Sequence, residues 1–108
     1  MDNQDSRHWF IQKFYGFSQQ EALIDEGIKY TYTDLLSAID RARQFIENEN
    51  VAPGQVIAIL SDYTIHSISV FFALLEKRNI IVPITTKVEN EINERFSEGN
   101  VDKAVVSF

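Results

Sequence analysis

The stretch from Val51 to Pro83, VAPGQVIAILSDYTIHSISVFFALLEKRNIIVP, constrains the fold more than any other part of the sequence. Residues 56–60 are five consecutive apolar residues, and such a short run without alternation is typical of a strand covered on both faces. From Ile65 the apolar spacing becomes helical, and residues 80–82 form a second apolar run. Two buried strands joined by a helix indicate a right-handed parallel crossover unit.

The helix of this unit should bury about half of its surface, because its apolar residues make a wide stripe. We expect that stripe to consist of Ile65, Ile68, Phe71, Phe72, Leu74 and Leu75. Asn79 is predicted to end the helix in the left-handed conformation. Pro83 is predicted to stop the second strand, because it has no N–H for the ladder.

The N-terminal third predicts a short helix followed by a hairpin. Residues 8–17 are rich in aromatic side chains, with Phe10 and Phe14 one helical turn apart. We expect a short helix there that packs inward, because such aromatic stripes usually do. The alternative is an aromatic platform for a ligand. Residues 22–24 and 28–32 read as two strands joined at Gly27, which supplies the positive φ of the turn. The second strand alternates, so Ile28, Tyr30 and Tyr32 should share a buried face.

Two further helices and a strand complete the pattern. The first helix should begin at Thr33 as N-cap, with Asp34 in its first turn, and end near Asn50. Its predicted apolar stripe contains Leu35, Ile39, Ala42 and Ile46. The second is marked by Val88, Ile92 and Phe96 and ends at Gly99-Asn100, and residues 104–108 look like a third buried strand.

The predicted fold class is therefore α/β. It consists of an N-terminal hairpin and a partial flavodoxin-like parallel sheet, with strands near 56–60, 80–83 and 104–107 and flanking helices. A domain that stops on an apolar strand leaves an open edge that can pair with another chain. We therefore expect residues 1–108 to be a single domain cut from a longer α/β protein, with self-association through that edge.

Composition excludes several classes of function. Sixteen acidic residues against ten basic ones give a net charge of −6 without a basic cluster, which argues against nucleic-acid binding. The absence of cysteine excludes disulfides, thiol nucleophiles and thiolate metal sites. The longest apolar run, 70–75, is far short of the roughly 20 residues that cross a bilayer, and no export signal precedes it. We expect a soluble cytoplasmic protein.

Few residues suggest chemistry. The four glycines are scattered, so no phosphate-binding loop is formed. His66 has Ser61, Asp62, Ser67 and Ser69 nearby in sequence, but no nucleophile elbow accompanies them, and serines at a helix start are usually caps. Asp62 could be a phosphoacceptor, although helix capping is the favoured role. Neither His8 nor His66 belongs to a metal motif. The glutamates at 89, 91, 94 and 98 are expected to form a solvent-exposed face of a helix. The sequence predicts no catalytic residue and no metal site.

Three segments, in order, resemble the AMP-forming adenylate synthetases, a superfamily of acyl- and aryl-CoA ligases, peptide-synthetase adenylation domains and luciferases. Residues 22–25 with 31–35 (ALID and TYTDL) resemble its "ALID…TYxEL" opening. Residues 51–60 (VAPGQVIAIL) resemble "GVxPGDxVAIL". Residues 72–75 with 80–84 (FALL and IIVPI) resemble "AlLkaGavvvPl". The resemblance runs from about Ala22 to Phe108. This chain has Asn50 and Asn79 where the superfamily commonly has glycine.

The resemblance implies a two-step reaction in the parent protein. A small-molecule carboxylate attacks the α-phosphate of Mg-ATP, giving an acyl-adenylate and pyrophosphate, and the thiol of coenzyme A or a carrier protein then takes the acyl group. The superfamily's Ser/Thr/Gly-rich loop, ribose-binding aspartate and C-terminal lysine have no counterpart within residues 1–108. The resemblance thus makes these residues the opening part of the large N-terminal domain, a scaffold without catalytic residues or a cofactor of its own.

Lys87 is the one candidate binding residue. It aligns with a basic residue that approaches a phosphate of coenzyme A in some of these ligases; the alternative is an ordinary exposed lysine. The competing hypothesis for the whole chain is a complete, non-catalytic flavodoxin-like module for interaction or regulation.

Overall fold

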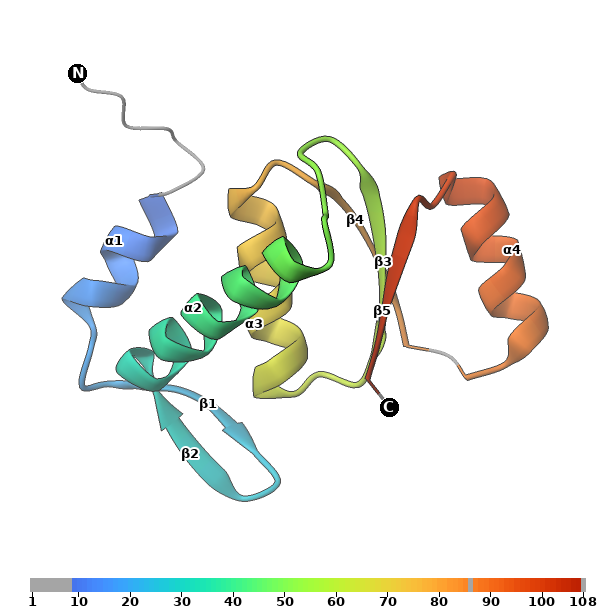
Figure 1. Cartoon of the computed structure of the whole chain (residues 1–108). Helices are drawn as coiled ribbons and strands as arrows, with labels where there is room; N and C mark the ends of the chain where they lie inside the picture. The colour runs from blue at the N-terminus through green and yellow to red at the C-terminus, as the bar shows by residue number, and fades with distance from the viewer. Residues whose placement is uncertain (1–8, 86, 108) are drawn as a thin grey trace.

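The structure is a computed structural model that describes residues 9–85 and 87–107. The elements in chain order are α1 (Trp9–Gly16), β1 (Glu21–Asp25), β2 (Ile28–Thr31), α2 (Tyr32–Asn48), β3 (Val56–Ser61), α3 (Ile65–Glu76), β4 (Ile80–Ile84), α4 (Glu89–Gly99) and β5 (Lys103–Ser107). β1 and β2 form an antiparallel hairpin, and β3, β4 and β5 form a separate parallel sheet (Figure 1). The predicted α/β class is confirmed.

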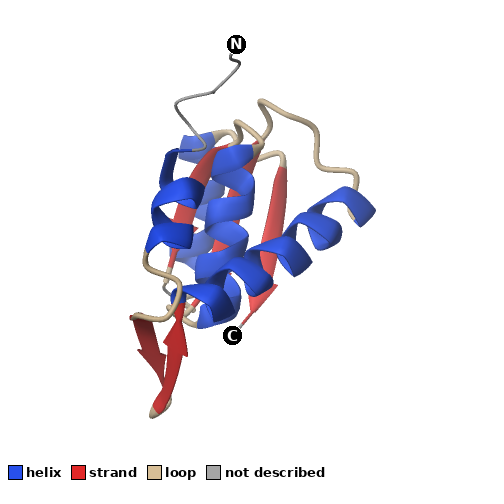
Figure 2. Cartoon of the chain, turned by 90° about the vertical axis from the view of Figure 1, so that its left-hand side faces the viewer, coloured by secondary structure: helices blue, strands red, loops and turns tan. Residues whose placement is uncertain are grey.

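β3 is the central strand of the parallel sheet, which has the order β4-β3-β5. Ile57 lies opposite Ile81 of β4 and Lys103 of β5, so the predicted parallel pairing is confirmed. The helices α2 and α3 cover one face of the sheet and α4 covers the other (Figures 1 and 2).

Burial on both faces of β3 explains its unbroken apolar run. Ile57 and Ile59 belong to the larger core cluster, formed with buried residues of α2 and α3. Ala58 and Leu60 point to the opposite face, where they meet Ile84 and are covered by partly buried side chains that include Ile92 and Phe96 of α4. Both faces of the strand are therefore apolar because both are covered.

β4 is less buried than predicted, and Pro83 does not stop it. Ile80 is 58% exposed, and the strand continues through Pro83 to the buried Ile84. The Ile80 N–H points toward β3, because it donates to the Gln55 carbonyl oxygen (3.1 Å). Peptide groups alternate in direction along a strand, so the nitrogen of Pro83, three residues later, points away from β3. Proline is tolerated there because no ladder hydrogen bond is lost.

The apolar stripe of α3 is only partly as predicted. The buried residues are Val70, Ala73 and Leu74, together with Ser67 and Ser69, because α3 packs against both the sheet and α2. Phe72 is half-buried, against the rings of Phe10 and Phe14 of α1 at centroid distances of 5.0 and 5.3 Å. This contact confirms that the aromatic N-terminal helix packs inward.

The end of α3 corrects the prediction for Asn79. Arg78, with φ of +68°, is the left-handed residue. Asn79 is instead buried, at 8% exposure, and its side-chain nitrogen donates to the carbonyl oxygens of Ala52 (2.7 Å) and Gln55 (3.2 Å). Asn79 therefore ties the loop before β3 to the start of β4.

The start of α2 also differs from the prediction. Thr31, not Thr33, is the N-cap: its hydroxyl oxygen accepts the Asp34 N–H (3.2 Å), and the Asp34 carboxylate accepts the Thr31 N–H (2.9 Å). The Thr33 hydroxyl donates to the Ser18 carbonyl oxygen. The predicted stripe of Leu35, Ile39, Ala42 and Ile46 is buried as expected, and Asn50 adopts a left-handed φ of +58° just after the helix.

The hairpin and the C-terminal elements follow the predicted boundaries with different burial. Glu26 and Gly27 both have positive φ, as a tight two-residue hairpin turn requires. Of the predicted buried face of the second strand, Tyr30 and Tyr32 are partly buried, and Tyr32 packs against the core. Ile28 is exposed, contrary to the prediction, because the hairpin projects from the body of the molecule (Figure 1). Asn100 ends α4 in the left-handed conformation, as predicted. Val106 of β5 is 65% exposed, so the third strand is not buried.

Candidate functional site

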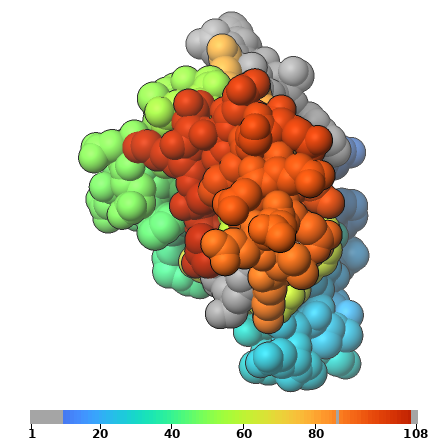
Figure 3. All heavy atoms as spheres, turned by 90° about the vertical axis from the view of Figure 1, so that its right-hand side faces the viewer, coloured from blue at the N-terminus to red at the C-terminus, as the bar shows by residue number. Residues whose placement is uncertain are grey.

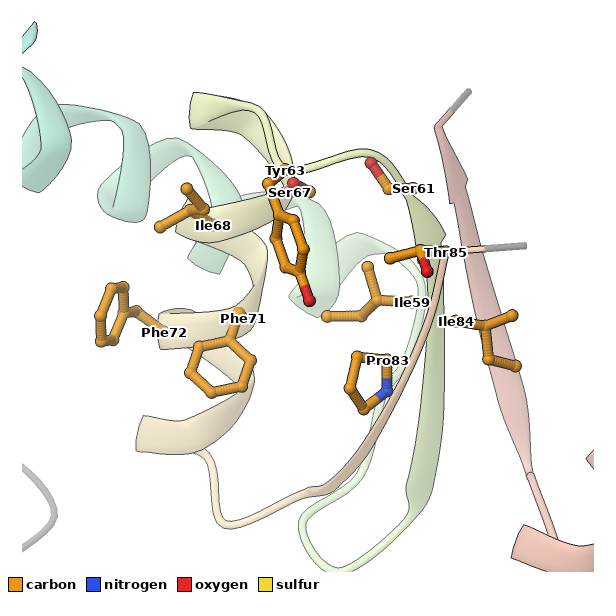
Figure 4. Close-up of a pocket in the computed structure, with 10 residues that line it drawn as sticks. All are labelled: Ile59, Ser61, Tyr63, Ser67, Ile68, Phe71, Phe72, Pro83, Ile84 and Thr85. Atoms are coloured by element: carbon orange, nitrogen blue, oxygen red, sulfur yellow. The ribbon is translucent and has the colours of Figure 1, made fainter. Parts of the chain in front are cut away.

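An apolar groove lies between α3 and the carboxyl-terminal halves of β3 and β4 (Figure 4). Its volume is about 290 Å³. The rings of Tyr63 and Phe71 face Ile59 and Pro83 across the open space. The described lining residues are Ile59, Ser61, Tyr63, Ser67, Ile68, Phe71, Phe72, Pro83, Ile84 and Thr85. In parallel α/β sheets, ligands bind at this end of the strands.

The groove offers contact surface but little reactivity. Among its described lining residues there is no carboxylate, imidazole, amine or guanidinium. The Ser61 and Ser67 hydroxyls both donate to the Asp62 carbonyl oxygen, at 2.8 and 2.7 Å. Since each serine already holds the loop that follows β3, neither is poised as a nucleophile.

The start of α3 explains why serine and threonine gather there. Thr64 is the N-cap: its hydroxyl oxygen accepts the Ser67 N–H (3.1 Å), while the Thr64 N–H donates to the Ser67 hydroxyl oxygen (2.9 Å). The predicted capping role of Asp62 is wrong, because the loop places Thr64 at that position. Asp62 contributes only its carbonyl oxygen to these bonds.

His66 lies on α3 beside Phe45 of α2. The imidazole is exposed and packs edge-on against Phe45 of α2, with ring centroids 6.5 Å apart. The Ser69 hydroxyl donates to the His66 carbonyl oxygen (2.7 Å), which is a helix-internal bond. His8 lies outside the described residues.

Lys87 follows β4 by three residues and is exposed. It lies beyond the carboxyl end of that strand and is two residues after Thr85, which lines the groove. An ammonium group at this position can meet an anionic ligand at the strand ends.

The described residues contain no group of three or more histidine, aspartate or glutamate side chains that could hold a metal ion. Within the same ranges, no helix combines the length and apolar character that spanning a membrane requires.

A two-pronged ion pair lies away from the groove, between α2 and α3. The Arg43 guanidinium donates to both oxygens of the Glu76 carboxylate, Nε to Oε1 (2.7 Å) and Nη2 to Oε2 (3.0 Å). These hydrogen bonds are the main reason that the pKa of Arg43 is raised. The charge of Glu76 and, more weakly, Asp40 raise it further, while burial of the guanidinium lowers it. This pair fixes the two helices and has a structural role.

Three positioning contacts were missed in the sequence. Asp25 of the hairpin accepts the Ile65 N–H of α3 (3.1 Å), and Asp102 accepts the Val56 N–H at the start of β3 (2.7 Å). Asn79 makes the loop contacts described above. Each joins residues more than 20 positions apart, so no local pattern signals it.

Comparison with known proteins identifies relatives of this chain. Residues 10–102 match the family described as "AMP-binding enzyme". A 3-oxocholest-4-en-26-oate–CoA ligase from Rhodococcus rhodochrous is 26% identical over 84 residues, which are 77% of this chain and 15% of the ligase.

Two solved structures show the same fold. The NpsA N-terminal subdomain of Klebsiella oxytoca, in complex with anthranilyl-AMSN, superposes with a TM-score of 0.86 at 20% identity, covering 94% of this chain and 26% of that one. The N-terminal domain of FACL13 from Mycobacterium tuberculosis, bound to an inhibitor, gives a TM-score of 0.83 at 15% identity over 95% of this chain and 27% of that one. This chain therefore spans about a quarter of either solved chain.

Proposed function

Because this chain belongs to the AMP-binding enzyme family, we propose that residues 1–108 are the opening part of the large N-terminal domain of an ATP-dependent, AMP-forming carboxylate ligase. The observation that carries the proposal is the family match, whose bounds, residues 10–102, include the hairpin, β3, α3, β4 and α4. The relative in Rhodococcus rhodochrous is itself a CoA ligase.

In the proposed reaction, a carboxylate oxygen of the substrate bonds to the α-phosphorus of ATP, and pyrophosphate leaves. A thiol sulfur then bonds to the acyl carbon, and AMP leaves. Mg-ATP, a small-molecule carboxylate and either coenzyme A or a carrier-protein thiol are the expected substrates. We propose the cytoplasm as the place where it acts.

In this reaction, residues 1–108 serve as a scaffold. The described residues offer no acidic cluster for magnesium. They also have no glycine-rich loop for phosphate, since Gly27 and Gly54 lie in isolated turns. Their contribution is a rigid sheet edge, with β3 and β4 ending side by side, on which the reacting groups of the remaining domain can be positioned.

Lys87 is the residue that we assign to ligand binding in the longer enzyme, as a cation near a phosphate of coenzyme A. Its exposure and its place beyond the carboxyl end of β4 support this role. A lysine binds phosphate as a point charge, so it contributes affinity without setting acyl specificity.

The test is to read the coding sequence downstream of Phe108 and to assay the complete product for carboxylate-dependent exchange of pyrophosphate into ATP. We expect a Ser/Thr/Gly-rich loop ending in Gly-Lys downstream and exchange that requires the acid. A stop codon directly after Phe108, or a complete protein that shows no exchange with a broad panel of aliphatic and aromatic acids, would contradict the proposal. The stop codon would favour the alternative, an interaction or regulatory module.

A further inference from the structure

The hairpin contacts the start of α3 through a carboxylate at the end of β1. Oδ2 of Asp25 accepts the N–H of Ile65, the first residue of α3. Figure 3 shows the cyan hairpin projecting from the rest of the molecule, and Figure 1 shows it at the same end as the loop between β3 and α3. The hairpin therefore holds the helix end of that loop.

The loop itself, residues 62–64, is tied to β3 and to the first turn of α3. The Asp62 carbonyl oxygen accepts the hydroxyls of Ser61 and Ser67, and Thr64 caps the helix through Ser67. These bonds all lie within residues 61–67, so they fix the shape of the loop. The bond from Asp25 comes from outside this segment and fixes the loop relative to the hairpin.

This loop borders the same groove as the segment that follows β4. The parallel register of the two strands ends with Leu60 opposite Ile84, so the chain leaves both strands at the same level. Tyr63 of the loop and Thr85 both line the groove. Since Thr85 is two residues before Lys87, a displacement of the loop would change the surroundings of the segment that we assign to a phosphate of coenzyme A.

We propose that Asp25 is a positioning residue for the thioester-forming step with coenzyme A. By accepting the Ile65 N–H, it holds the loop after β3 in the place that binding of coenzyme A beside Lys87 requires. Asp25 forms no bond and transfers no proton in this step. The inference rests on the proposed function, because it needs both the ligase reaction and the assignment of Lys87.

The two steps of the reaction should respond differently to the loss of this contact. In the resemblance described above, the loop and the aspartate that bind ATP lie beyond residues 1–108, whereas Lys87 lies close to the loop after β3. Release of the loop should therefore weaken the binding of coenzyme A and leave adenylate formation unchanged. The requirement is for an oxygen, because the first N–H groups of a helix have no partner within it.

The test uses the complete enzyme and measures the two steps separately. Carboxylate-dependent exchange of pyrophosphate into ATP reports adenylate formation, and the KM for coenzyme A at saturating acid and ATP reports the second step. We expect Asp25→Ala to raise that KM about fivefold, because this factor corresponds to the usual contribution of a capping oxygen. The exchange rate should stay within about twofold of the wild-type value.

Conservative variants separate the oxygen from the charge. Asp25→Asn keeps an acceptor oxygen, so it should return the KM for coenzyme A to within about twofold of the wild-type value. Asp25→Ser has a side chain too short to reach the Ile65 N–H and should behave like Asp25→Ala; it serves in place of that variant if the alanine protein does not fold. A raised KM in Asp25→Asn equal to that in Asp25→Ala would overturn the positioning role of the oxygen.

Thr31→Ala is the matched control. It also removes a capping oxygen, but from α2, and Thr31 is not among the described residues that line the groove. We expect its KM for coenzyme A to be unchanged. An equal rise in both variants would mean that the effect is general destabilisation, and would overturn the inference.

The remaining outcomes distinguish this inference from the proposed function. If the wild-type enzyme shows exchange but makes no thioester of coenzyme A, or if the KM is unchanged in Asp25→Ala, the inference fails and adenylate formation stands. If the wild-type enzyme shows no exchange with any acid, the proposed function fails and the inference fails with it.

Discussion

The Asp25 carboxylate oxygen Oδ2 lies 3.1 Å from the backbone nitrogen of Ile65 and accepts its N–H, across 40 residues of sequence. Ile65 is the first residue of α3, whose N-terminal N–H groups have no partner within the helix. The hairpin thus supplies an anionic cap to the helix that borders the groove. The charge also complements the positive end of the helix dipole.

Replacing Asp25 should uncouple the hairpin from α3. Loss of a capping oxygen typically costs about 1 kcal/mol, so we expect Asp25→Ala to lower the free energy of unfolding by about that amount. Asp25→Asn keeps an acceptor oxygen and loses the charge, so it should cost about half as much. Urea melts would measure both, and equal stability of Asp25→Ala and the wild-type chain would contradict the link.

Phe72 should contribute more to stability than Phe71, its neighbour on α3. Phe72 packs against the rings of Phe10 and Phe14, whereas Phe71 is 37% exposed at the groove. We expect Phe72→Ala to cost about 3 kcal/mol, because burial is lost and a cavity remains. Phe71→Ala should cost about 1 kcal/mol. The reverse order in denaturant melts would mean that the groove, not the aromatic contact with α1, is the better packed region.

Arg78 occupies a backbone conformation that suits glycine better. Its φ of +68° is the left-handed region, which costs residues with a β-carbon about 1–2 kcal/mol. Arg78→Gly should therefore be more stable than Arg78→Ala by about 1 kcal/mol. The alanine variant loses the same side chain without relief of the backbone, so the difference isolates the conformational effect. No difference in thermal or urea melts would contradict it.

The β3-α3-β4 region shows which parts of the fold can be predicted from the sequence. The crossover of β3, α3 and β4 was predictable, because runs such as 56–60 and the helical spacing after Ile65 depend only on which faces are covered. The left-handed turn after α3 was predicted one residue late. Asparagine has the higher intrinsic preference for that conformation, but Asn79 is used for two long-range hydrogen bonds.

The exposure of Val106 and Ile80 could not be predicted from their apolar character. Both lie on edge strands, and strand order becomes visible only in three dimensions. The same holds for the groove, whose lining comes from three elements. The superfamily resemblance was carried by short motifs in β1, at the start of α2, and in β3, α3 and β4, which a sequence does display.

Lys87 can be tested only in the longer enzyme that we propose. Loss of one ammonium–phosphate contact should raise the KM for coenzyme A by about tenfold, equivalent to about 1.4 kcal/mol, while the KM for ATP stays unchanged. Lys29→Ala, at an exposed lysine of the hairpin, is the matched control and should change neither value. An unchanged KM for coenzyme A in Lys87→Ala would leave Lys87 as an ordinary surface lysine.

Isothermal titration of residues 1–108 with Mg-ATP tests the central claim most directly, namely that this segment is a platform without a nucleotide site of its own. We predict no saturable heat at nucleotide concentrations up to about 1 mM, which corresponds to less than about 4 kcal/mol of binding free energy. Saturable binding with a dissociation constant in the micromolar range would contradict the account.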